Sequence, residues 1–368
     1  MDALPLRSDA ARRSTDRAVS VPIVATVDDL RIGILGAAAI APAAAIRPAR
    51  HVDGVAVTAI AARDRARAEA FATRYGVETV HHSYATLLDD PDIDAVYIPL
   101  PNGLHGAWTK RAIEAGKHVL CEKPFAANAS EAREVAEVAA ASDRVVMEAF
   151  HWRYHPLNTA VLDAVAAGDF GQITDVRGAF CFPLPKPSDI RWSRALAGGS
   201  LMDAGCYPIN MVRAVMAAAG ATEPTVTGAK AAFTNGGVDR ALRGTLHWSA
   251  ATAAEGTTGA IRCGMFDPFH PVDIRLAITG TGGSVRVRNP LAPQLFGHAV
   301  YRRDGRRRVE RATRTPSYTF QMVAFRDAIR EGTPFPSTAH DAVANMAVID
   351  ALYEAAGVTP HVPTPMAG

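Results

Sequence analysis

The sequence predicts an α/β fold with a doubly wound parallel sheet, followed by an α+β domain with an open, mostly antiparallel sheet. Three observations predict this fold class. From residue 30 to residue 150, short apolar runs alternate with helical segments. After residue 150, segments of alternating polarity follow one another and are bounded by glycine and proline. The chain has 368 residues, which is enough to bury two cores.

In the first half, five apolar runs are predicted to be strands and three periodic segments to be helices. Strands that alternate with helices form right-handed βαβ units, so this order indicates a parallel sheet. The expected strands are 31–35, 55–62, 94–100, 117–121 and 144–150, and the expected helices are 65–75 with Gly76 as its C-cap, 105–115, and 130–141 starting at Ser130.

In the second half, five segments alternate polar and apolar residues, which is typical of antiparallel strands. They are 173–182, 225–234, 241–250, 272–280 and 283–289, with one helix at 200–218 between them and two helices, 318–332 and 338–357, after them. The change of sheet type near residue 150 marks the domain boundary. The chain therefore divides into an extension (1–29), a first domain (30–150), a second domain (151–358) and a tail (359–368).

Composition excludes several classes of protein. The hydrophobic fraction of 48% and the charged fraction of 21% are ordinary for a soluble globular protein. A net charge of +2 creates no strong field, so we expect no nucleic-acid partner, and no run of about eighteen apolar residues predicts a membrane span. The four cysteines lack C-x-x-C spacing, which is typical of a reduced, cytoplasmic protein.

The N-terminal extension resembles a twin-arginine export signal only faintly. Arg12 and Arg13 precede a weakly apolar stretch, but that stretch is short and Pro22 interrupts it. We therefore expect residues 1–29 to be a disordered extension. Such an extension would also arise if a start codon upstream of the true one had been chosen.

The segment after the first strand carries a reduced dinucleotide fingerprint. The usual pattern is G-x-G-x-x-G/A, in which the second glycine lets the backbone approach a pyrophosphate. Residues 36–41 read Gly-Ala-Ala-Ala-Ile-Ala, so only the first glycine remains. Ala38 is compatible with a bound dinucleotide if the turn needs no positive φ there. The segment predicts a Rossmann domain, although a plain strand-turn-helix also fits it.

The end of the second strand favours one form of the cofactor. An acid at this position accepts from a ribose 2′-hydroxyl, whereas an arginine can bind a 2′-phosphate. Because Arg63 precedes Asp64, we expect NADP, with NAD possible. The alternative is that both residues only begin a solvated helix.

Two more loops reach the carboxyl edge of the sheet, where ligands of open α/β sheets bind. The fourth strand ends in YIPLPNGLH (97–105), and Asn102 there offers a donor and an acceptor, although it also fits the N-cap of the next helix. The expected cofactor contacts are Gly36, Ala37, Ala38, Ile40, Arg63, Pro99, Asn102, His105, Glu122 and Lys123.

Lys123 lies between Glu122 and Pro124, directly after a buried strand. Hydride transfer from an alcohol needs a group that accepts the hydroxyl proton and a group that polarises the nascent carbonyl. A partly desolvated lysine near a nicotinamide can do either, so we predict that Lys123 is catalytic.

The partners of Lys123 are expected from GGSLMDAGCYPIN (198–210), where Asp203 and Tyr207 are four residues apart. On a helix this spacing puts both side chains on one face. The alternative is that Ser200 and Asp203 form a capping box. Pro208 predicts a kink or break near Tyr207.

The motifs GILGAAAIA, AARD, PLPNGLH, CEKP and GGSLMDAGCYPIN occur in an order and spacing that resemble the glucose–fructose oxidoreductase / inositol dehydrogenase / rhizopine-catabolism family over residues 30–358. Within it, the chain is similar to the branch of dihydrodiol dehydrogenases and NADP-dependent xylose dehydrogenases. The resemblance implies a nicotinamide-binding Rossmann domain and a C-terminal sheet that forms the interface of a homodimer or homotetramer.

The resemblance also implies site residues. The family's catalytic lysine falls on Lys123, often beside a cis-proline at Pro124, and its acid falls on Asp203. Its His/Tyr position is filled by Tyr207, where histidine is commoner. Ala38 departs from the family's second fingerprint glycine.

We therefore expect an NADP-dependent oxidoreductase that acts on an aldose, cyclic polyol or diol. Tyr207, with an ordinary pKa of about 10, would need the charge of Lys123 to become a base, and Asp203 would hold Lys123 or a substrate hydroxyl. Lys123, Tyr207, Arg153 and Trp192 are the expected substrate contacts.

Two alternatives share this scaffold: a sugar–sugar oxidoreductase that keeps NADP bound, and a non-catalytic nucleotide-sensing regulator. A zinc hydrolase is disfavoured because none of the twelve histidines begins an H-E-x-x-H motif, so we expect no metal.

Overall fold

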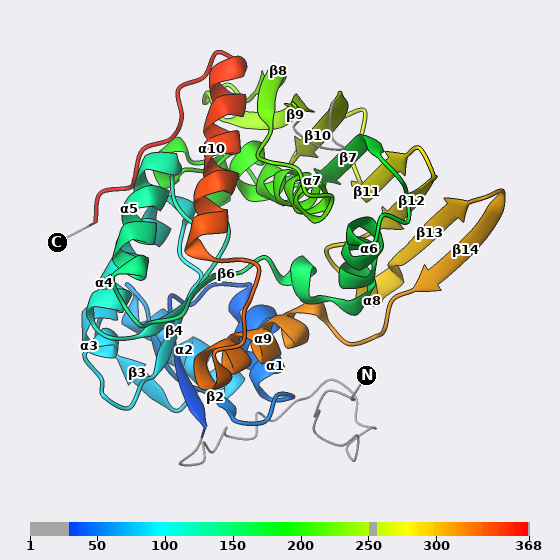
Figure 1. Ribbon diagram of the computed structural model, residues 1–368. Coiled ribbons are helices and arrows are strands. Elements are labelled where there is room, and N and C mark those ends of the chain that lie inside the picture. The colour runs from blue at the N-terminus through cyan, green and yellow to red at the C-terminus, as the bar shows by residue number, and fades with distance from the viewer. Residues whose placement is uncertain (1–28, 250–255, 367–368) are drawn as a thin grey trace.

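The computed structural model describes residues 29–249 and 256–366. Two sheets make up its framework, a parallel one in the first half and a larger, mostly antiparallel one in the second (Figure 1). The predicted fold class is confirmed. The extension expected at 1–29 lies outside the described residues, apart from Asp29.

The first sheet has six parallel strands in the order β3-β2-β1-β4-β5-β6. The strand order reverses between β1 and β4, and the loops that follow these two strands meet at the carboxyl edge. The strand β3 was not expected, because only three partly exposed residues form it. The strands are β1 (Leu30–Leu35), β2 (Val55–Ala61), β3 (Thr79–His81), β4 (Ala95–Ile98), β5 (His118–Cys121) and β6 (Val146–Glu148).

Helices cover both faces of this sheet, and each face has its own apolar core. The helix α2 begins at the N-cap Asp64 and ends at Gly76, whose φ of 71° is left-handed, as predicted. The helix α5 starts one residue earlier than expected, because Asn128 rather than Ser130 supports its N-terminus. The segments are a π-helical turn η1 (Pro42–Ile46), α1 (Arg47–Ala49), α2 (Arg65–Tyr75), α3 (Tyr84–Leu88), α4 (His105–Glu114) and α5 (Ala129–Ala140).

The second sheet has eight strands in the order β14-β13-β12-β11-β7-β10-β9-β8. All neighbours are antiparallel except β7 and β10. The strands β10, β13 and β14 were not expected; β14 is almost entirely polar, so apolar alternation could not reveal it. The strands are β7 (Ile173–Cys181), β8 (Thr225–Phe233), β9 (Asp239–Trp248), β10 (Thr257–Gly264), β11 (Asp273–Gly280), β12 (Gly283–Arg288), β13 (His298–Arg303) and β14 (Arg306–Arg311).

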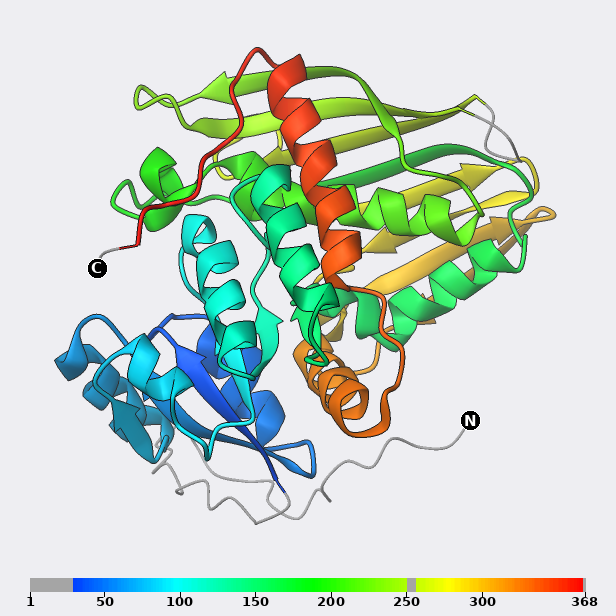
Figure 2. The same cartoon turned by 60° about the vertical axis from the view of Figure 1, so that its left-hand side comes forward.

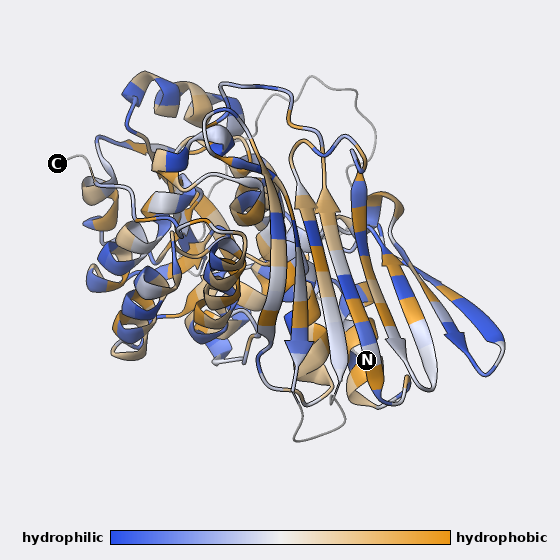
Figure 3. Cartoon of the chain, turned by 90° about the horizontal axis from the view of Figure 1, so that it is seen from above, coloured by the Kyte–Doolittle hydropathy of each residue, from blue (hydrophilic) through white to orange (hydrophobic). Residues whose placement is uncertain are grey.

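Helices cover only one face of the larger sheet, as Figures 2 and 3 show. The core on that face joins apolar residues of the strands to α7 and α10. The helical segments are α6 (Pro156–Ala166), a π-helical turn η6 (Leu201–Gly205), α7 (Cys206–Ala218), α8 (Pro293–Phe296), α9 (Ser317–Glu331) and α10 (Ala339–Ala355).

The last two helices tie the halves together. The helix α10 packs along α5, while α9 packs against α1 and buries Met322 and Phe325 in the core of the first sheet. The two sheets therefore separate near residue 150, while α9, which comes late in the chain, packs on the first sheet. The chain then runs back to the first half, where the amide of Thr364 donates to the carbonyl of Gly103 at 2.8 Å.

Two expectations from composition concern the whole molecule. The four cysteines, Cys121, Cys181, Cys206 and Cys263, are free and buried. Within residues 29–249 and 256–366, no helix is long and apolar enough to cross a membrane.

Candidate active site

Lys123 stands where the two halves of the chain meet. It follows β5 directly, and its peptide bond to Pro124 is cis. The Nζ atom donates to the main-chain oxygen of Asp203 at 3.0 Å and lies 5.3 Å from the centroid of the Tyr207 ring. The structure thus brings the three predicted catalytic residues together. Asp203 is expected to hold Lys123 or a substrate hydroxyl, and in the structure its main-chain oxygen is the atom that accepts the bond from Lys123.

The Asp203 carboxylate is held by two other side chains. Its oxygens lie 3.3 Å from Nδ2 of Asn102 and 3.4 Å from Nε of Arg191. Burial raises the pKa of Asp203, while the charges of Lys123 and Arg191 oppose that rise. Asp203 therefore joins the loop after β4, through Asn102, to the segment before η6, through Arg191. The capping-box alternative does not hold, because the side chain of Ser200 makes no cap hydrogen bond.

The turn before η6 requires glycine. Gly199 has a φ of +142°, and a Cβ atom there would lie 2.1 Å from the carboxylate of Asp239. That carboxylate accepts from the Ser200 hydroxyl at 2.6 Å and the Leu201 amide at 2.7 Å. Asp239 therefore anchors the start of the segment that carries Asp203, a role that no spacing in the sequence indicated.

Tyr207 lies in the first turn of α7 and is 5% exposed. Phe150 and Phe180 pack edge-on against its ring, at centroid distances of 5.4 and 5.6 Å. Pro208 is accommodated because the first turn needs no amide donor from it, and the irregularity expected here is the π-helical turn η6 just before. Burial raises the pKa of Tyr207 well above its ordinary value.

His151 is the residue of this cluster that the sequence analysis missed. Its Nε2 atom lies 3.1 Å from the Tyr207 hydroxyl, and its Nδ1 atom lies 2.8 Å from Oγ of Ser317. Tyr318 stacks on the imidazole with a centroid distance of 3.9 Å. These partners come from α7 and α9, so nothing in the local sequence could have identified His151.

The fingerprint loop has the form that a dinucleotide needs. Gly36 has a φ of +109°, and a Cβ atom there would lie 3.0 Å from Leu100 and 3.8 Å from the Tyr84 hydroxyl. Ala38 does not have a positive φ, so its methyl group is compatible with this turn. Ala37 is buried with its carbonyl accepting from Nη2 of Arg67 at 2.8 Å. Ile40, also predicted as a contact, is half-buried.

Arg63 is exposed at the carboxyl end of β2. Asp64 beside it accepts from the Arg67 amide at 3.1 Å, so its carboxylate serves as the N-cap of α2. The charges of Arg63 and Arg67 both lower the pKa of Tyr84, against the larger effect of burial, which raises it. The guanidinium groups of Arg63 and Arg67 and the phenol of Tyr84 therefore lie around the fingerprint loop. Of these three residues, the sequence analysis predicted only Arg63.

The loop after β4 is braced rather than free. Nδ1 and Nε2 of buried His105 lie 2.6 and 2.7 Å from the carbonyl oxygens of Pro124 and Leu100, so neither nitrogen is left for a ligand. Burial lowers the pKa of His105 to about 4. Asn102 is not a helix cap, because its amide donates to Ala197 and Asp203. Pro99 is buried beside this loop.

Glu122 is 7% exposed and accepts from the Tyr97 hydroxyl at 2.8 Å. Burial raises its pKa, opposed by the charge of Lys123. Glu122 therefore places a buried carboxyl group next to Lys123, whose amide donates to it at 3.3 Å.

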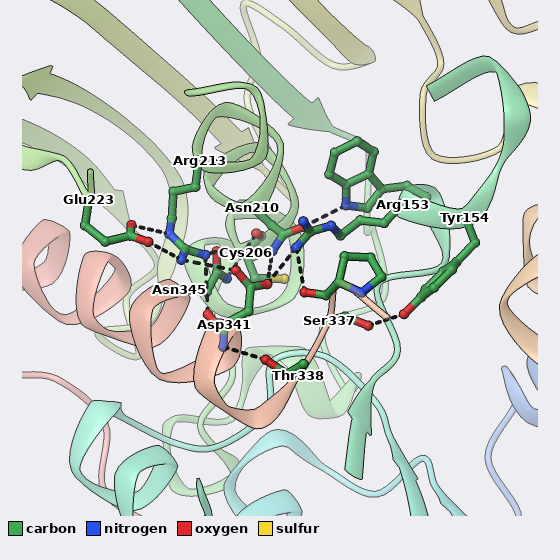
Figure 4. A network of polar contacts seen from close by, with 12 residues as sticks. Arg153, Tyr154, Cys206, Asn210, Arg213, Glu223, Ser337, Thr338, Asp341 and Asn345 are labelled. Atoms are coloured by element: carbon green, nitrogen blue, oxygen red, sulfur yellow. Dashed lines mark hydrogen bonds and ion pairs between the residues drawn. The ribbon is translucent and has the colours of Figure 1, made fainter. Parts of the chain in front are cut away.

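The remaining two predicted substrate contacts are Arg153 and Trp192. Nη1 of Arg153 lies 2.8 Å from the carboxylate of Asp341 (Figure 4). Asp341 also contacts three other residues: Asn210, Arg213 and Thr338. The structure thus uses Arg153 to join the short 3-10 helix η3 (His151–Tyr154) to α10.

Trp192 is half-buried in the short segment Ile190–Trp192, next to Arg191. Because Arg191 reaches Asp203, this segment lies against the cluster. Within the described ranges, no group of three or more His, Cys, Asp and Glu residues could hold a metal ion.

Comparisons with known proteins agree with this geometry. The model of an oxidoreductase family with an NAD-binding Rossmann fold matches residues 30–150, and the model of the GFO/IDH/MocA C-terminal domain matches residues 159–286. The D-xylose 1-dehydrogenase (NADP(+)) 2 of Haloferax volcanii is 36% identical over 328 residues, covering 89% of this chain and 97% of that protein. The trans-1,2-dihydrobenzene-1,2-diol dehydrogenase of Mus musculus is 30% identical, covering 64% of this chain and 68% of its own.

A solved structure of an oxidoreductase is also similar to this chain. A 3-ketoreductase from Actinomadura kijaniata, in complex with NADP and TDP-benzene, is similar with a TM-score of 0.78 and 29% identity over 89% of this chain and 98% of its own. Together with the matched models, these relatives show that the chain belongs to the GFO/IDH/MocA family and is an NAD(P)-dependent oxidoreductase acting on CH–OH or keto groups of sugars or sugar-like substrates.

Proposed function

We propose that this enzyme transfers a hydride between NADP and a hydroxyl-bearing carbon of an aldose, cyclic polyol or diol, with Lys123 and Tyr207 at the reacting oxygen. The observation that carries the proposal is the position of the Lys123 ammonium, which lies between the Asp203 carbonyl and the Tyr207 ring. A nicotinamide cofactor, when bound, supplies the hydride acceptor or donor. The chain supplies a positive charge and a proton-transfer group beside it.

Lys123 acts on the substrate oxygen as a fixed charge. An ammonium that is half-buried is worth more to a developing negative charge than one in water, and it needs no reorganisation if it is already held. The Asp203 carbonyl and the face of the Tyr207 ring hold it. Asn102 and Arg191 position this arrangement through Asp203.

The turn at Gly36 supports a bound dinucleotide, and two arginines near it support NADP over NAD. The turn at Gly36 leaves room for a backbone approach, since a side chain there would meet Leu100. Arg63 is exposed at the strand end where the adenosine ribose lies in Rossmann domains, and Arg67 is fixed next to it on the Ala37 carbonyl. A 2′-phosphate at this point would gain two charge-assisted partners.

Two side chains near Asp203 and the names of two relatives support this substrate class. Arg191 and Trp192 present a guanidinium and an aromatic face on one short segment, which suits a ring with several hydroxyls. D-xylose and trans-1,2-dihydrobenzene-1,2-diol, named for two relatives, both carry a carbinol next to another hydroxyl. We propose Trp192 and Arg191 as substrate contacts, and Arg153 as a packing residue.

The family resemblance also carries a proposal on assembly. The uncovered face of the larger sheet bears five basic residues along one line of paired positions across six strands, which Ala179 of β7 interrupts between the third and the fourth: Lys230, Arg243, Arg262, Arg275 and Arg288. We propose that copies associate through this face as a homodimer or homotetramer. Facing rows of like charge repel one another, so the associated fraction in sedimentation velocity should rise as salt increases from about 0.05 M to about 0.5 M; a single 38.9 kDa species at all concentrations contradicts the proposal.

The experiment that tests the proposed function uses the purified full chain. A panel of pentoses, hexoses, inositols and vicinal diols is scored by NADPH fluorescence, with NAD in parallel. The expected result is oxidation of at least one of these compounds, faster with NADP than with NAD. Nucleotide binding without turnover of any compound in either direction would contradict it and favour a nucleotide-sensing regulator.

The same preparation separates a dehydrogenase from a sugar–sugar oxidoreductase. A dehydrogenase releases its cofactor in every turnover, so the desalted protein should show no absorbance of bound NADP(H). Stoichiometric retained cofactor, reduced by one sugar and reoxidised by another, would favour the second enzyme.

A further inference from the structure

His151 connects the Tyr207 hydroxyl to a chain of hydrogen bonds that ends inside the protein. Nε2 faces the Tyr207 hydroxyl at 3.1 Å, and Nδ1 faces Oγ of Ser317 at 2.8 Å. The Ser317 hydroxyl in turn lies 3.2 Å from the carbonyl oxygen of Leu291. His151 is 5% exposed and Ser317 fully buried, so water does not compete for these bonds.

The last partner in this chain is a carbonyl oxygen, and we assign the direction of the other bonds from it. A carbonyl oxygen only accepts, so Ser317 donates its single hydrogen to Leu291. Ser317 must then accept from His151, which places the imidazole hydrogen on Nδ1. In a neutral imidazole Nε2 is therefore a lone pair, and it accepts the hydrogen of the Tyr207 hydroxyl.

The charges around the pair keep both groups neutral before reaction. Burial lowers the pKa of His151 to about 3, and the charges of Lys123 and His155 act in the same direction. Burial raises the pKa of Tyr207, with Tyr318, Glu122, Cys206 and Glu148 adding to the rise. Tyr207 therefore does not rest as a tyrosinate, and burial opposes the effect on this phenol that is expected from the charge of Lys123.

We propose that His151 is the proton acceptor behind Tyr207, so that the phenol passes a proton on instead of ionising; this rests on the proposed function. In oxidation, the substrate O–H bond breaks and its proton forms a new bond to the Tyr207 oxygen. In the same step the original Tyr207 O–H bond breaks and its proton bonds to Nε2 of His151. The hydride goes to the oxidised nicotinamide that the enzyme's activity supplies.

Atoms and charge balance in this step. Tyr207 is neutral before and after, His151 becomes an imidazolium, and the substrate becomes a carbonyl compound. The imidazolium keeps its Nδ1–H bond to Ser317, so no partner has to move. In reduction the same step runs backwards: His151 first takes up a proton, then the Nε2–H bond breaks and re-forms the Tyr207 O–H bond while the original Tyr207 proton bonds to the carbonyl oxygen.

The kinetic test compares His151→Gln with wild type, using the most active compound of the sugar panel. Glutamine can accept the Tyr207 hydrogen bond but cannot take the proton, so it separates positioning from proton transfer. We expect kcat to fall about 100-fold or more with the KM for substrate changed less than about threefold. We also expect the residual activity to rise with pH, because the phenol must then ionise. A His151→Gln variant with wild-type kcat and pH profile would overturn the proposal.

A second measurement needs no turnover and so separates this proposal from the proposed function. Imidazole nitrogen shifts in nitrogen-15 NMR spectra of the cofactor-free protein should show His151 protonated at Nδ1 alone at neutral pH. Tyr207→Phe should shift its Nε2 resonance, and Ser317→Ala its Nδ1 resonance. Protonation at Nε2 would overturn the relay even in an active enzyme, whereas an inactive wild type with the expected tautomer would contradict only the proposed function.

Discussion

The Nζ atom of Lys123 lies 3.0 Å from the main-chain oxygen of Asp203, eighty residues further along the chain. One residue follows a strand of the parallel sheet, and the other lies in the turn that starts α7. The contact joins the two halves of the molecule at the point where the proposed chemistry takes place. The ammonium is held by a carbonyl oxygen, while the charge of Lys123 acts on the nearby carboxyl groups of Asp203 and Glu122.

Removal of the Lys123 ammonium should abolish most turnover. We expect Lys123→Ala to lower kcat by about 10²–10⁴-fold, because the charge on the substrate oxygen loses its partner, while NADP affinity changes little. Steady-state kinetics and a fluorescence titration with NADPH measure the two effects. Lys110→Ala, which only removes an outlying ion pair with Glu134, is the matched control and should leave kcat unchanged. Equal kinetics in both variants would rule Lys123 out as a catalytic residue.

Cofactor choice should depend on Arg63. We expect Arg63→Ala to raise the KM for NADP by about 10-fold, as the loss of a charge-assisted hydrogen bond to a phosphate predicts, and to leave the KM for NAD unchanged. The ratio of kcat/KM for the two cofactors is the measurement. Arg74→Ala, near the other end of α2, should not change this ratio. If the two cofactors respond to Arg63→Ala alike, the arginine binds neither 2′-phosphate nor ribose.

Asp341 should contribute more to stability than a surface acid. Arg213 is 4% exposed and contacts both Asp341 at 3.2 Å and Glu223 at 2.7 Å, and Arg153 also contacts Asp341. We expect Asp341→Ala to lower the free energy of unfolding by about 2–3 kcal/mol, because buried donors lose a charged acceptor. Glu223→Ala, whose carboxylate is 56% exposed, should cost less than about 1 kcal/mol. Urea unfolding measures both, and a larger loss for Glu223→Ala would contradict this ranking.

His155 should make the fold sensitive to acid. Its Nδ1 atom accepts from the Leu157 amide at 3.1 Å as the N-cap of α6, and burial lowers its pKa to about 4. The unfolded chain binds the proton at about pH 6.5, so the stabilising contribution of neutral His155 is present above that pH and is lost as the pH falls toward 4.

The variant His155→Asn tests this contribution. Asparagine keeps an N-cap acceptor but does not titrate, so its unfolding free energy should fall by about 2–3 kcal/mol less than that of wild type between pH 6.5 and pH 4. His340→Asn, at an exposed position, is the control and should follow the wild-type curve. Parallel curves for wild type and His155→Asn would mean that His155 does not carry the proton linkage.

Much of the fold could be predicted because it depends on local pattern. The buried parallel strands are continuous apolar runs, and Asp64 and Gly76 begin and end α2 as their side chains and backbone preferences dictate. By contrast, β3 is too short to show a pattern and β14 is nearly all polar, so pairing with their neighbours alone makes them strands. The helix α9 has an ordinary amphipathic pattern, which does not say which sheet it covers.

The sequence by itself determined which residues could carry the chemistry: a glycine at the first turn, a lysine after a buried strand, and an aspartate and a tyrosine one helical turn apart. Only the tertiary structure decided that the Asp203 carbonyl holds Lys123, that Arg153 packs against α10, and that His151 lies behind Tyr207. These contacts join residues from 56 to 188 positions apart. Local propensity acts over a few residues, so such contacts arise only when separate elements pack together.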